Sequence, residues 1–382
     1  MIWRIVGRLL AVIGGGIVLF AGAALAYNAF AHYQSRLDGW PPHSEFAPAV
    51  AWAPDDPAKV RILALDGGGL YGLAWLEILK DLEDKSGRPI AEMFDFVAGT
   101  STGAIIGALL LAPDENGKPK YDAEEIEKIY LDLSRQIFYV PAYHKVLTLN
   151  GLLGPRFFNH AKFIESREVF QGYRFGALLR PMMIPAYSRK DSSLHEFINV
   201  REPDANLRLG PLLAAATSVP GMFPGVHLLG DSQYAGIYDD AGFILNNPAH
   251  RAFEYVLARD PKSHIVVVSI GPTPKKKATS DVAVNSGFIA WLTPVFRMIF
   301  KGQADLSTDS LETIETIGTI VSLRAFRLAV PMAHVSPFDA SQSNIERIEK
   351  AGRDYIKANR TLLGEVLESL RPGPSSETTR SP

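Results

Sequence analysis

Residues 63–72 read LALDGGGLYG, and residues 93–112 read MFDFVAGTSTGAIIGALLLA. Each stretch starts with a short apolar run typical of a buried strand, continues through a glycine-containing turn and ends in residues typical of a helix. Strand, turn and helix follow one another twice, which implies right-handed crossovers between parallel strands. We therefore predict an α/β fold with a mostly parallel sheet.

Other segments extend this pattern along the chain. Apolar runs predict strands over residues 60–65, 93–100, 181–188 and 263–271, and helical spacing predicts helices over residues 71–87, 103–112, 122–138, 209–219 and 345–370. Residues 139–163 are irregular and aromatic, and residues 139–158 could line an acyl channel. Residues 287–300 suit either a buried helix interrupted at Pro294 or a lid that lies in a membrane interface.

Composition limits the classes of function. The chain has 382 residues, a net charge of -2 and no cysteine. The charge gives no reason to expect a nucleic-acid partner, and the missing thiols exclude disulfides, thiolate metal sites and cysteine nucleophiles. No His, Asp or Glu cluster has metal-ligand spacing, so we expect neither a metal nor another cofactor.

The N-terminal segment differs from the rest of the chain. Residues 9–31 form an uncharged run. An apolar run of about 20 residues is long enough to span the core of a bilayer. Arg4 and Arg8 precede the run and predict a cytoplasmic N-terminus, with the following residues on the non-cytoplasmic side. The length favours a retained single-pass anchor. The alternative is a signal peptide cleaved after Ala24-Leu25-Ala26, which would give a secreted or periplasmic protein.

The predicted organisation follows from these segments. We expect an anchor or signal segment over residues 1–34, a linker over 35–59, a catalytic core over 60–252 and a C-terminal part of the same domain over 253–371. Residues 372–382 have no apolar residues to bury and are expected to be disordered. The basic stretch 274–280 suits a solvated loop or a contact with anionic lipid.

The second turn carries a candidate nucleophile. Residues 99–103, GTSTG, fit G-x-S-x-G, a pattern that places a serine on a sharp strand-to-helix turn. The flanking Gly99 and Gly103 leave room for a substrate, and the dipole of the following helix favours negative charge at Ser101. The simpler alternative is that Ser101 only caps the helix.

A nucleophilic serine needs a base. None of the nine histidines has a compelling setting, although His334 fits a Ser–Asp–His order. The stretch YDDAGFILNNPAH at residues 238–250 offers Asp240, followed by two small residues and by an Asn pair that could pin the loop. Taken alone, Asp240 would be an ordinary Asx turn.

Taken together, the glycine loop, the serine turn and the aspartate resemble the patatin-like phospholipases, over about residues 60–252. The resemblance implies a three-layer α/β/α sandwich that uses a Ser–Asp dyad. It makes Ser101 the nucleophile and Asp240, rather than Asp239, the base. It assigns the oxyanion hole to the glycine loop and gives supporting roles to further motif residues. The oxyanion residues are Gly67, Gly68 and Gly69, and the supporting residues are Asp66, Gly72, Gly99, Gly103, Ala241, Gly242, Asn246 and Asn247.

The chain departs from that family at two positions. The family usually has Arg or Lys where this chain has Tyr71, and glycine where it has Ala241, so the support of the loop and the shape of the aspartate turn are in question. Residues 67–72 also fit the dinucleotide pattern G-x-G-x-x-G. Asp66 would then lie against a pyrophosphate, and no acidic residue ends the next strand, so we reject this interpretation.

These features predict a membrane-associated serine hydrolase that cleaves fatty acyl esters of phospholipids or related lipids. The expected partners are the lipid substrate and the membrane. Two alternatives are kept. One is a non-catalytic scaffold that binds lipid or a partner, and the other is a serine esterase or peptidase acting on non-lipid substrates.

Overall fold

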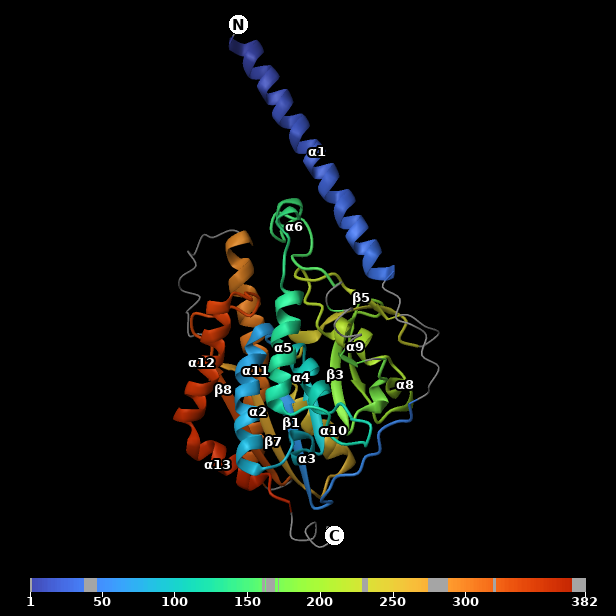
Figure 1. Ribbon diagram of the computed structural model, residues 1–382, viewed down its shortest axis with the longest axis vertical. Helices are drawn as coiled ribbons and strands as arrows, with labels where there is room; N and C mark the ends of the chain where they lie inside the picture. The colour runs from blue at the N-terminus through green and yellow to red at the C-terminus, as the bar shows by residue number, and fades with distance from the viewer. Residues whose placement is uncertain are drawn as a thin grey trace.

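The computed structural model describes residues 2–37, 47–159, 162, 169–170, 172–228, 233–273, 288–318 and 321–372. The described strands form one eight-stranded sheet in the order β5-β6-β3-β2-β1-β7-β8, with β4 paired to β3. Figure 1 shows this sheet between layers of helices. The strands are β1 Lys59–Leu65, β2 Phe96–Gly99, β3 Met182–Ser188, β4 Ser193–Ile198, β5 Val226–Leu228, β6 Gly236–Asp240, β7 His264–Thr273 and β8 Leu323–Pro331.

The centre of the sheet is parallel. β1 pairs in parallel with β2 and β7, and the parallel pairing continues from β2 to β3 and from β7 to β8. Antiparallel pairs occur where β3 meets β4 and β6, and where β5 meets β6. The prediction of a mostly parallel sheet is confirmed.

Helices cover both faces of the sheet. Along β1, Leu63 and Leu65 pack into one apolar cluster, whereas Val60, Ile62 and Ala64 pack into a second one, as alternation along a buried strand requires. The first face carries α2 Gly72–Ser86, α4 Thr102–Leu110, α5 Ala123–Ile137, α9 Leu209–Ala216, α12 Gln342–Ala358 and α13 Arg360–Ser369. The second face carries α10 Ala249–Arg259 and α11 Phe288–Ile317. The predicted three-layer sandwich is therefore confirmed.

Short elements complete the fold. They are η1 Gly69–Tyr71, α3 Ile90–Met93, α6 Ala142–Leu147, η2 Phe175–Ala177, α8 Glu202–Ala205 and η3 Ala241–Phe243. The helix predicted over residues 122–138 is α5, and a capping box at Asp122 and Glu125 fixes its start. The helix predicted up to residue 219 ends earlier, at Ala216.

The structure corrects two helix predictions. The single helix expected over residues 345–370 is two helices, because the chain leaves helical geometry at Asn359, whose side-chain amide donates to the Tyr355 carbonyl. The interruption expected at Pro294 is absent, and α11 continues through this residue. A proline removes one backbone hydrogen bond, which a helix of 30 residues can lose.

Part of the predicted linker also belongs to the body. The Val50 N–H donates to the Asn199 carbonyl, and the Trp52 indole donates to Asp260. Trp52 also packs against Phe96. Residues 47–59 are therefore not a free tether. The basic stretch 274–280 and residues 373–382 of the tail lie outside the described residues.

The N-terminal helix α1 Ile2–Leu37 projects away from the body (Figure 1). Its segment Val6–Phe30 is long and apolar enough to cross a membrane, and very little of it is buried. A signal sequence has the same properties. The helix touches the body near its C-terminal end, where the Tyr27 hydroxyl and His144 Nδ1 lie 2.7 Å apart.

Candidate active site

Ser101 lies on a strained turn between β2 and α4. Its φ of 53° and ψ of −119° form a conformation that side-chain-bearing residues rarely adopt. Such a residue costs about 1–3 kcal/mol and persists only where its surroundings enforce it. Its side chain makes no capping hydrogen bond, so the helix-cap interpretation is not met.

The flanking glycines make this turn sterically feasible. A Cβ on Gly103 would clash with the Leu65 carbonyl, and one on Gly99 would clash with the backbone of Gly103. The backbone at the start of helix α4 therefore lies directly against the end of β1 and against the end of β2. The register pairs Leu65 with Gly99, so the loop after β1 and the serine turn after β2 emerge side by side.

The topology brings Asp240 to the same place. β4 pairs with β3 along its whole length, so both β2 and β6 must use the opposite edge of β3. On that edge, β2 pairs with Met182 and Met183, whereas β6 pairs further along, from Ala186 to Ser188, and runs in the reverse direction. The C-terminal ends of β2 and β6 consequently face each other.

The two carboxylate oxygens of Asp240 differ in their surroundings. Oδ1 accepts a 2.7 Å hydrogen bond from the Gly242 N–H, which is the Asx turn expected from sequence. Oδ2 is buried, and among the described residues it has no hydrogen bond of standard geometry, although the Ser101 hydroxyl is close enough to act on it. Burial raises the pKa of Asp240 to about 6, although the neighbouring Ser101 hydroxyl, the Gly242 N–H and Lys162 all act to lower it.

The glycine loop after β1 is held in a definite orientation. The Gly67 N–H donates to the Asn246 carbonyl at 3.1 Å, so Gly67, expected in the oxyanion hole, has no free N–H. The Gly68 carbonyl accepts from Tyr71, which directs the Gly69 N–H the opposite way across the trans peptide. Among the described residues, no acceptor faces the N–H groups of Gly68 and Gly69.

The left-handed residue of the loop has to be glycine. Gly69 has a φ of +52°, and a Cβ there would collide with the Pro337 carbonyl. Its own carbonyl accepts 2.9 Å hydrogen bonds from the hydroxyls of Thr102 and Tyr130. Thr102 directly follows Ser101, so one residue couples the glycine loop to the serine turn.

A cation that the sequence did not reveal supports this loop. Arg327, on β8, donates to both carboxylate oxygens of Asp66 at 2.8 and 2.6 Å, and to Ser269 at 2.7 Å. Burial lowers the pKa of Arg327, but the Asp66 carboxylate more than offsets this effect and the pKa rises. The glycine loop therefore has a cation near it although Tyr71 is uncharged, because the buried ion pair of Arg327 with Asp66 lies directly before the loop.

The Asn pair fixes the Asp240 loop to the rest of the body. Asn246 binds Gly67 through its backbone carbonyl. The Asn247 side chain accepts from the Ala249 N–H at 3.0 Å and from Ser269 at 3.2 Å. The Gln303 side chain, from α11, accepts from the N–H groups of both asparagines. Only Asn247 uses its side-chain amide in the expected way.

The Ala241 departure causes no strain. Ala241 begins η3 and is absent from the positive-φ residues, so this turn does not need glycine. The neighbouring Asp239 is separate from the site, because its carboxylate pairs with Arg189 and does not line the cavity. Asp240 is therefore the only carboxylate of that pair that the cavity exposes to a ligand.

These groups surround a cavity of about 550 Å³. Ser101, Asp240 and the three glycines line it. Most of the remaining wall is apolar and comes from residues distant in sequence, including Ile105, Ile137, Phe138, Val219, Phe223, Met332, Val335 and Phe338. None of the described histidines lines it, and His334, the candidate by chain order, is exposed on a turn. Within the described residues, no His, Asp and Glu side chains gather as metal ligands would.

Lys162 is a second residue that the sequence did not reveal. The side chain is buried in the cavity wall, and Nζ donates to Ser218 Oγ at 2.9 Å. The Ser218 carbonyl in turn accepts the Asp240 N–H at 3.0 Å. Burial lowers the pKa of Lys162 to about 7, and Asp240 and Asp239 oppose the shift. The amine thus lies close enough to Asp240 to influence its charge.

Comparison with known proteins agrees with this geometry. The family model described as patatin-like phospholipase matches residues 63–253, which is half of the chain. The chain belongs to the patatin-like phospholipase family. The match contains the glycine loop, the serine turn and Asp240, whereas Arg327 lies beyond it.

Individual members of the family are distant. Patatin-like protein 2 of Arabidopsis thaliana is 31% identical, over 78% of this chain and 83% of the relative. Calcium-independent phospholipase A2-gamma of Oryctolagus cuniculus is 24% identical, over 82% of this chain and 40% of the relative. Probable inactive patatin-like protein 9 of Arabidopsis thaliana is 27% identical, over 59% of this chain and 64% of the relative.

Proposed function

We propose that this patatin-like protein is a serine lipid acyl hydrolase that cleaves fatty acyl esters of phospholipids or related lipids. One observation carries the proposal. Ser101 has a strained backbone and lines a largely apolar cavity beside the buried carboxylate of Asp240. Within the described part of the chain, Asp240 Oδ2 and the N–H groups of Gly68 and Gly69 have no other hydrogen-bond partner. The membership of the family and the phospholipase A2-gamma relative support it.

The first half of the reaction acylates the serine. Asp240 Oδ2 takes the proton of the Ser101 hydroxyl as Oγ attacks the ester carbonyl carbon. The carbonyl oxygen becomes an oxyanion, which accepts hydrogen bonds from the N–H groups of Gly68 and Gly69. Asp240 then returns the proton to the departing alcohol, and the fatty acyl group stays on Ser101.

The second half releases the fatty acid. Water replaces the alcohol, gives a proton to Asp240 and attacks the acyl carbon of acyl-Ser101, and the same N–H groups hold the second oxyanion. The bond between that carbon and Ser101 Oγ then breaks, Asp240 returns the proton to Oγ, and the fatty acid leaves. Loss of one such donor costs about 3–4 kcal/mol of barrier in comparable sites. With a pKa of about 6, Asp240 is ionised at neutral pH yet still accepts a proton readily.

The cavity wall supports a lipid substrate. Aromatic and aliphatic side chains of α4, α5 and the segments after α9 and after β8 form it, and an acyl chain gains free energy from leaving water there. A peptide or a small polar ester would find few polar partners on this wall.

The test is release of fatty acid from a panel of purified phospholipids and acylglycerols by the full-length protein. We expect hydrolysis by the wild type and loss of it by several orders of magnitude in Ser101→Ala. Asp239→Asn is the matched control and should stay active, because Asp239 pairs with Arg189 outside the cavity. If the wild type releases no fatty acid from any lipid, the lipid hydrolase proposal fails, and the two alternatives are a non-catalytic scaffold and a serine hydrolase of non-lipid substrates.

We further propose that α1 anchors the protein in a membrane, with the N-terminus in the cytoplasm and the catalytic body on the other side. The apolar segment Val6–Phe30 and its low burial support the span, and Arg4 with Arg8 support the orientation. Anchored protein should resist alkaline extraction. N-terminal sequencing that starts at Tyr27 would instead identify a cleaved signal peptide.

A further inference from the structure

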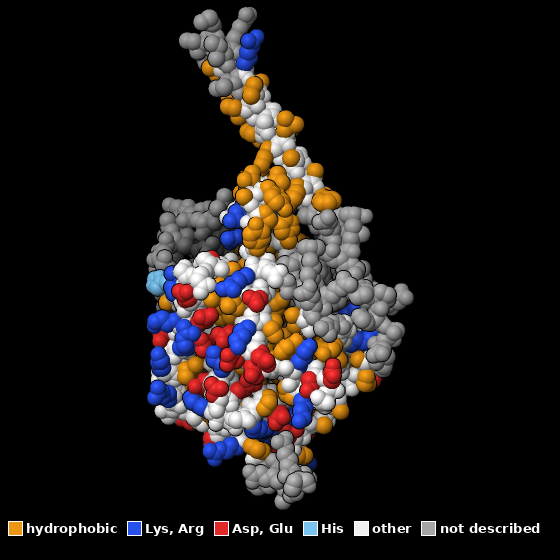
Figure 2. Space-filling model, viewed as in Figure 1, with side chains coloured by type: hydrophobic (Ala, Val, Ile, Leu, Met, Phe, Trp, Pro, Cys, Tyr) orange, Lys and Arg blue, Asp and Glu red, His pale blue; other side chains and the backbone are white. Residues whose placement is uncertain are grey.

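An exposed apolar surface lies where α1 meets the body. Six large side chains in and around α6 are between 45% and 73% exposed, although residues of this kind are usually buried. We call this surface the α6 patch, and it consists of Tyr139, Tyr143, Val146, Leu149, Leu152 and Leu153. Figure 2 shows hydrophobic side chains gathered at this place, beside the lower part of α1.

We propose that the α6 patch docks on the surface of the lipid bilayer that α1 crosses and brings the catalytic cavity to the membrane. This inference rests on the proposed function, because docking serves to bring lipid substrate to the catalytic cavity. The occupant of the patch is thus a bilayer interface, and the contacts between α1, α6 and the cavity point to it.

The first support is the level at which α6 meets α1. The Tyr27 hydroxyl lies 2.7 Å from His144 Nδ1, and the rings of Tyr27 and Tyr143 meet edge-on. The Asn28 side chain donates to the Leu153 carbonyl at 3.3 Å. Because Tyr27 and Asn28 lie near the end of the apolar segment Val6–Phe30, these contacts place α6 at the interface of a bilayer that this segment would span.

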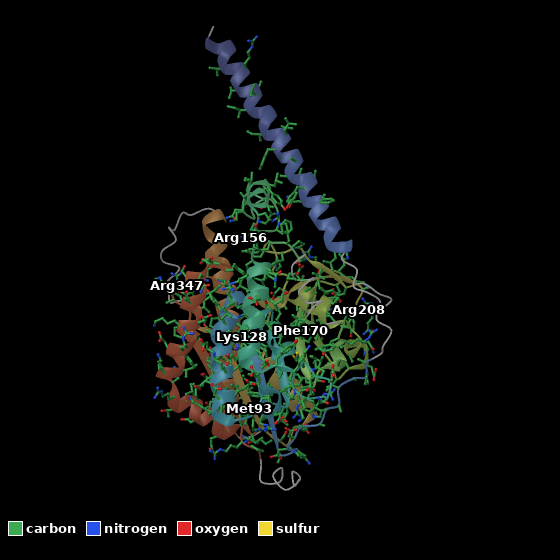
Figure 3. The ribbon with its side chains drawn as sticks, viewed as in Figure 1. Met93, Lys128, Arg156, Phe170, Arg208 and Arg347 are labelled. Carbon is green, nitrogen blue, oxygen red and sulfur yellow. The ribbon has the colours of Figure 1, made fainter. Side chains whose placement is uncertain are left out.

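The second support is charge. Residues 139–158 contain Lys145 and Arg156 and no Asp or Glu. An apolar surface that carries cations and lacks carboxylates suits the headgroup region of a membrane with anionic lipids. Figure 3 shows Arg156 at the end of the body that carries α6 and α1, whereas Met93 lies toward the opposite end.

The third support is the short path from the patch to the catalytic cavity. Ile137 and Phe138, just before the patch, line that cavity. A second cavity of about 340 Å³ is lined by Asn28, His144 and Leu153, and Phe223 borders both cavities. The patch therefore adjoins the catalytic cavity directly through Ile137 and Phe138, and the second cavity through the shared Phe223.

The absence of cysteine permits a direct test. Val146→Cys and Leu152→Cys variants of the full-length chain are labelled with an environment-sensitive fluorophore and reconstituted in vesicles of phosphatidylglycerol and brominated phosphatidylcholine. Glu368→Cys, on α13 at the opposite end of the body, is the control. We expect bromolipid quenching at 146 and 152 and none at 368. A lack of quenching at 146 and 152 overturns the proposal. A protein partner or a second copy that covered the patch would give this result.

A kinetic test separates docking from catalysis. The double variant Val146→Glu/Leu152→Glu should lose about tenfold or more in hydrolysis of vesicle lipid, because two apolar contacts with the bilayer become charged. Hydrolysis of a soluble short-chain ester should be unchanged, since neither residue lines the catalytic cavity. Equal loss on both substrates contradicts docking. If the wild type hydrolyses neither substrate, the proposed function fails while the quenching result still decides the docking proposal.

Discussion

Replacement of Arg327 by leucine should both destabilise the protein and slow it. Arg327 contributes two charge-assisted hydrogen bonds to Asp66, whose side chain is completely buried. Without the guanidinium, the carboxylate stays in the interior without its cation. Removal of one partner of a buried ion pair typically costs about 3–5 kcal/mol of unfolding free energy.

The kinetic effect follows from the position of Asp66 directly before the glycine loop. Loss of one oxyanion donor costs about 100- to 1000-fold in kcat. Displacement of the loop should therefore lower kcat by at least about tenfold. Asp66→Asn/Arg327→Leu should recover much of the stability, because a neutral amide is cheaper to bury than a lone carboxylate. Tyr71→Phe should be mild, since the hydrogen bond from its hydroxyl to the Val335 carbonyl is long, at 3.3 Å.

The assay is urea unfolding of the detergent-solubilised full-length protein, together with kcat on a soluble acyl ester. Arg324→Leu is the matched control, because Arg324 lies on the same strand but forms exposed ion pairs with Glu315 and Glu365. Exposed pairs contribute about 0–1 kcal/mol. If Arg327→Leu costs no more stability than Arg324→Leu and keeps wild-type kcat, the ion pair does not support the loop.

The remaining predictions concern the proton, the histidines and the orientation. Activity should rise with pH through about 6, because Asp240 acts as a base only when ionised. Lys162→Met should move this rise to higher pH, since Lys162 lowers the pKa of Asp240, and an unmoved profile would show that the amine has only a structural role. Alanine at His250 or at His334 should leave most of the activity, as neither lines the cavity, and a loss comparable to Ser101→Ala would point to a Ser–His mechanism instead. An export-dependent reporter fused to the C-terminus should be active, whereas activity of a cytoplasmic reporter alone would reverse the proposed topology.

Local patterns made the central part of the fold predictable. The strand before the glycine loop, the serine turn and the helices after both are each encoded within about ten residues, so their apolar spacing identified them. The turn at Asp240 was also predictable from the sequence, because Asp followed by small residues commonly forms an Asx turn. Its place opposite Ser101 was beyond local patterns, since it depends on β2 and β6 sharing one edge of β3.

Arg327 and Lys162 escaped prediction for related reasons. Arg327 lies 261 residues from Asp66, and the two arginines of β8 break the apolar run that would have marked a strand. A buried carboxylate at the end of β1 was itself a signal that a cation had to come from elsewhere. Lys162 lies in a stretch without periodicity, so only the fold shows that the amine reaches the cavity wall.

Labelling with a fluorophosphonate, followed by peptide mass spectrometry, tests the central claim most directly, because the reagent needs an activated serine. The proposal that Ser101 is activated by Asp240 predicts an adduct on Ser101 in the wild type and in Asp239→Asn, and none in folded Asp240→Asn. Equal labelling of Ser101 in Asp240→Asn, or an adduct on a different serine, would contradict the Ser–Asp mechanism.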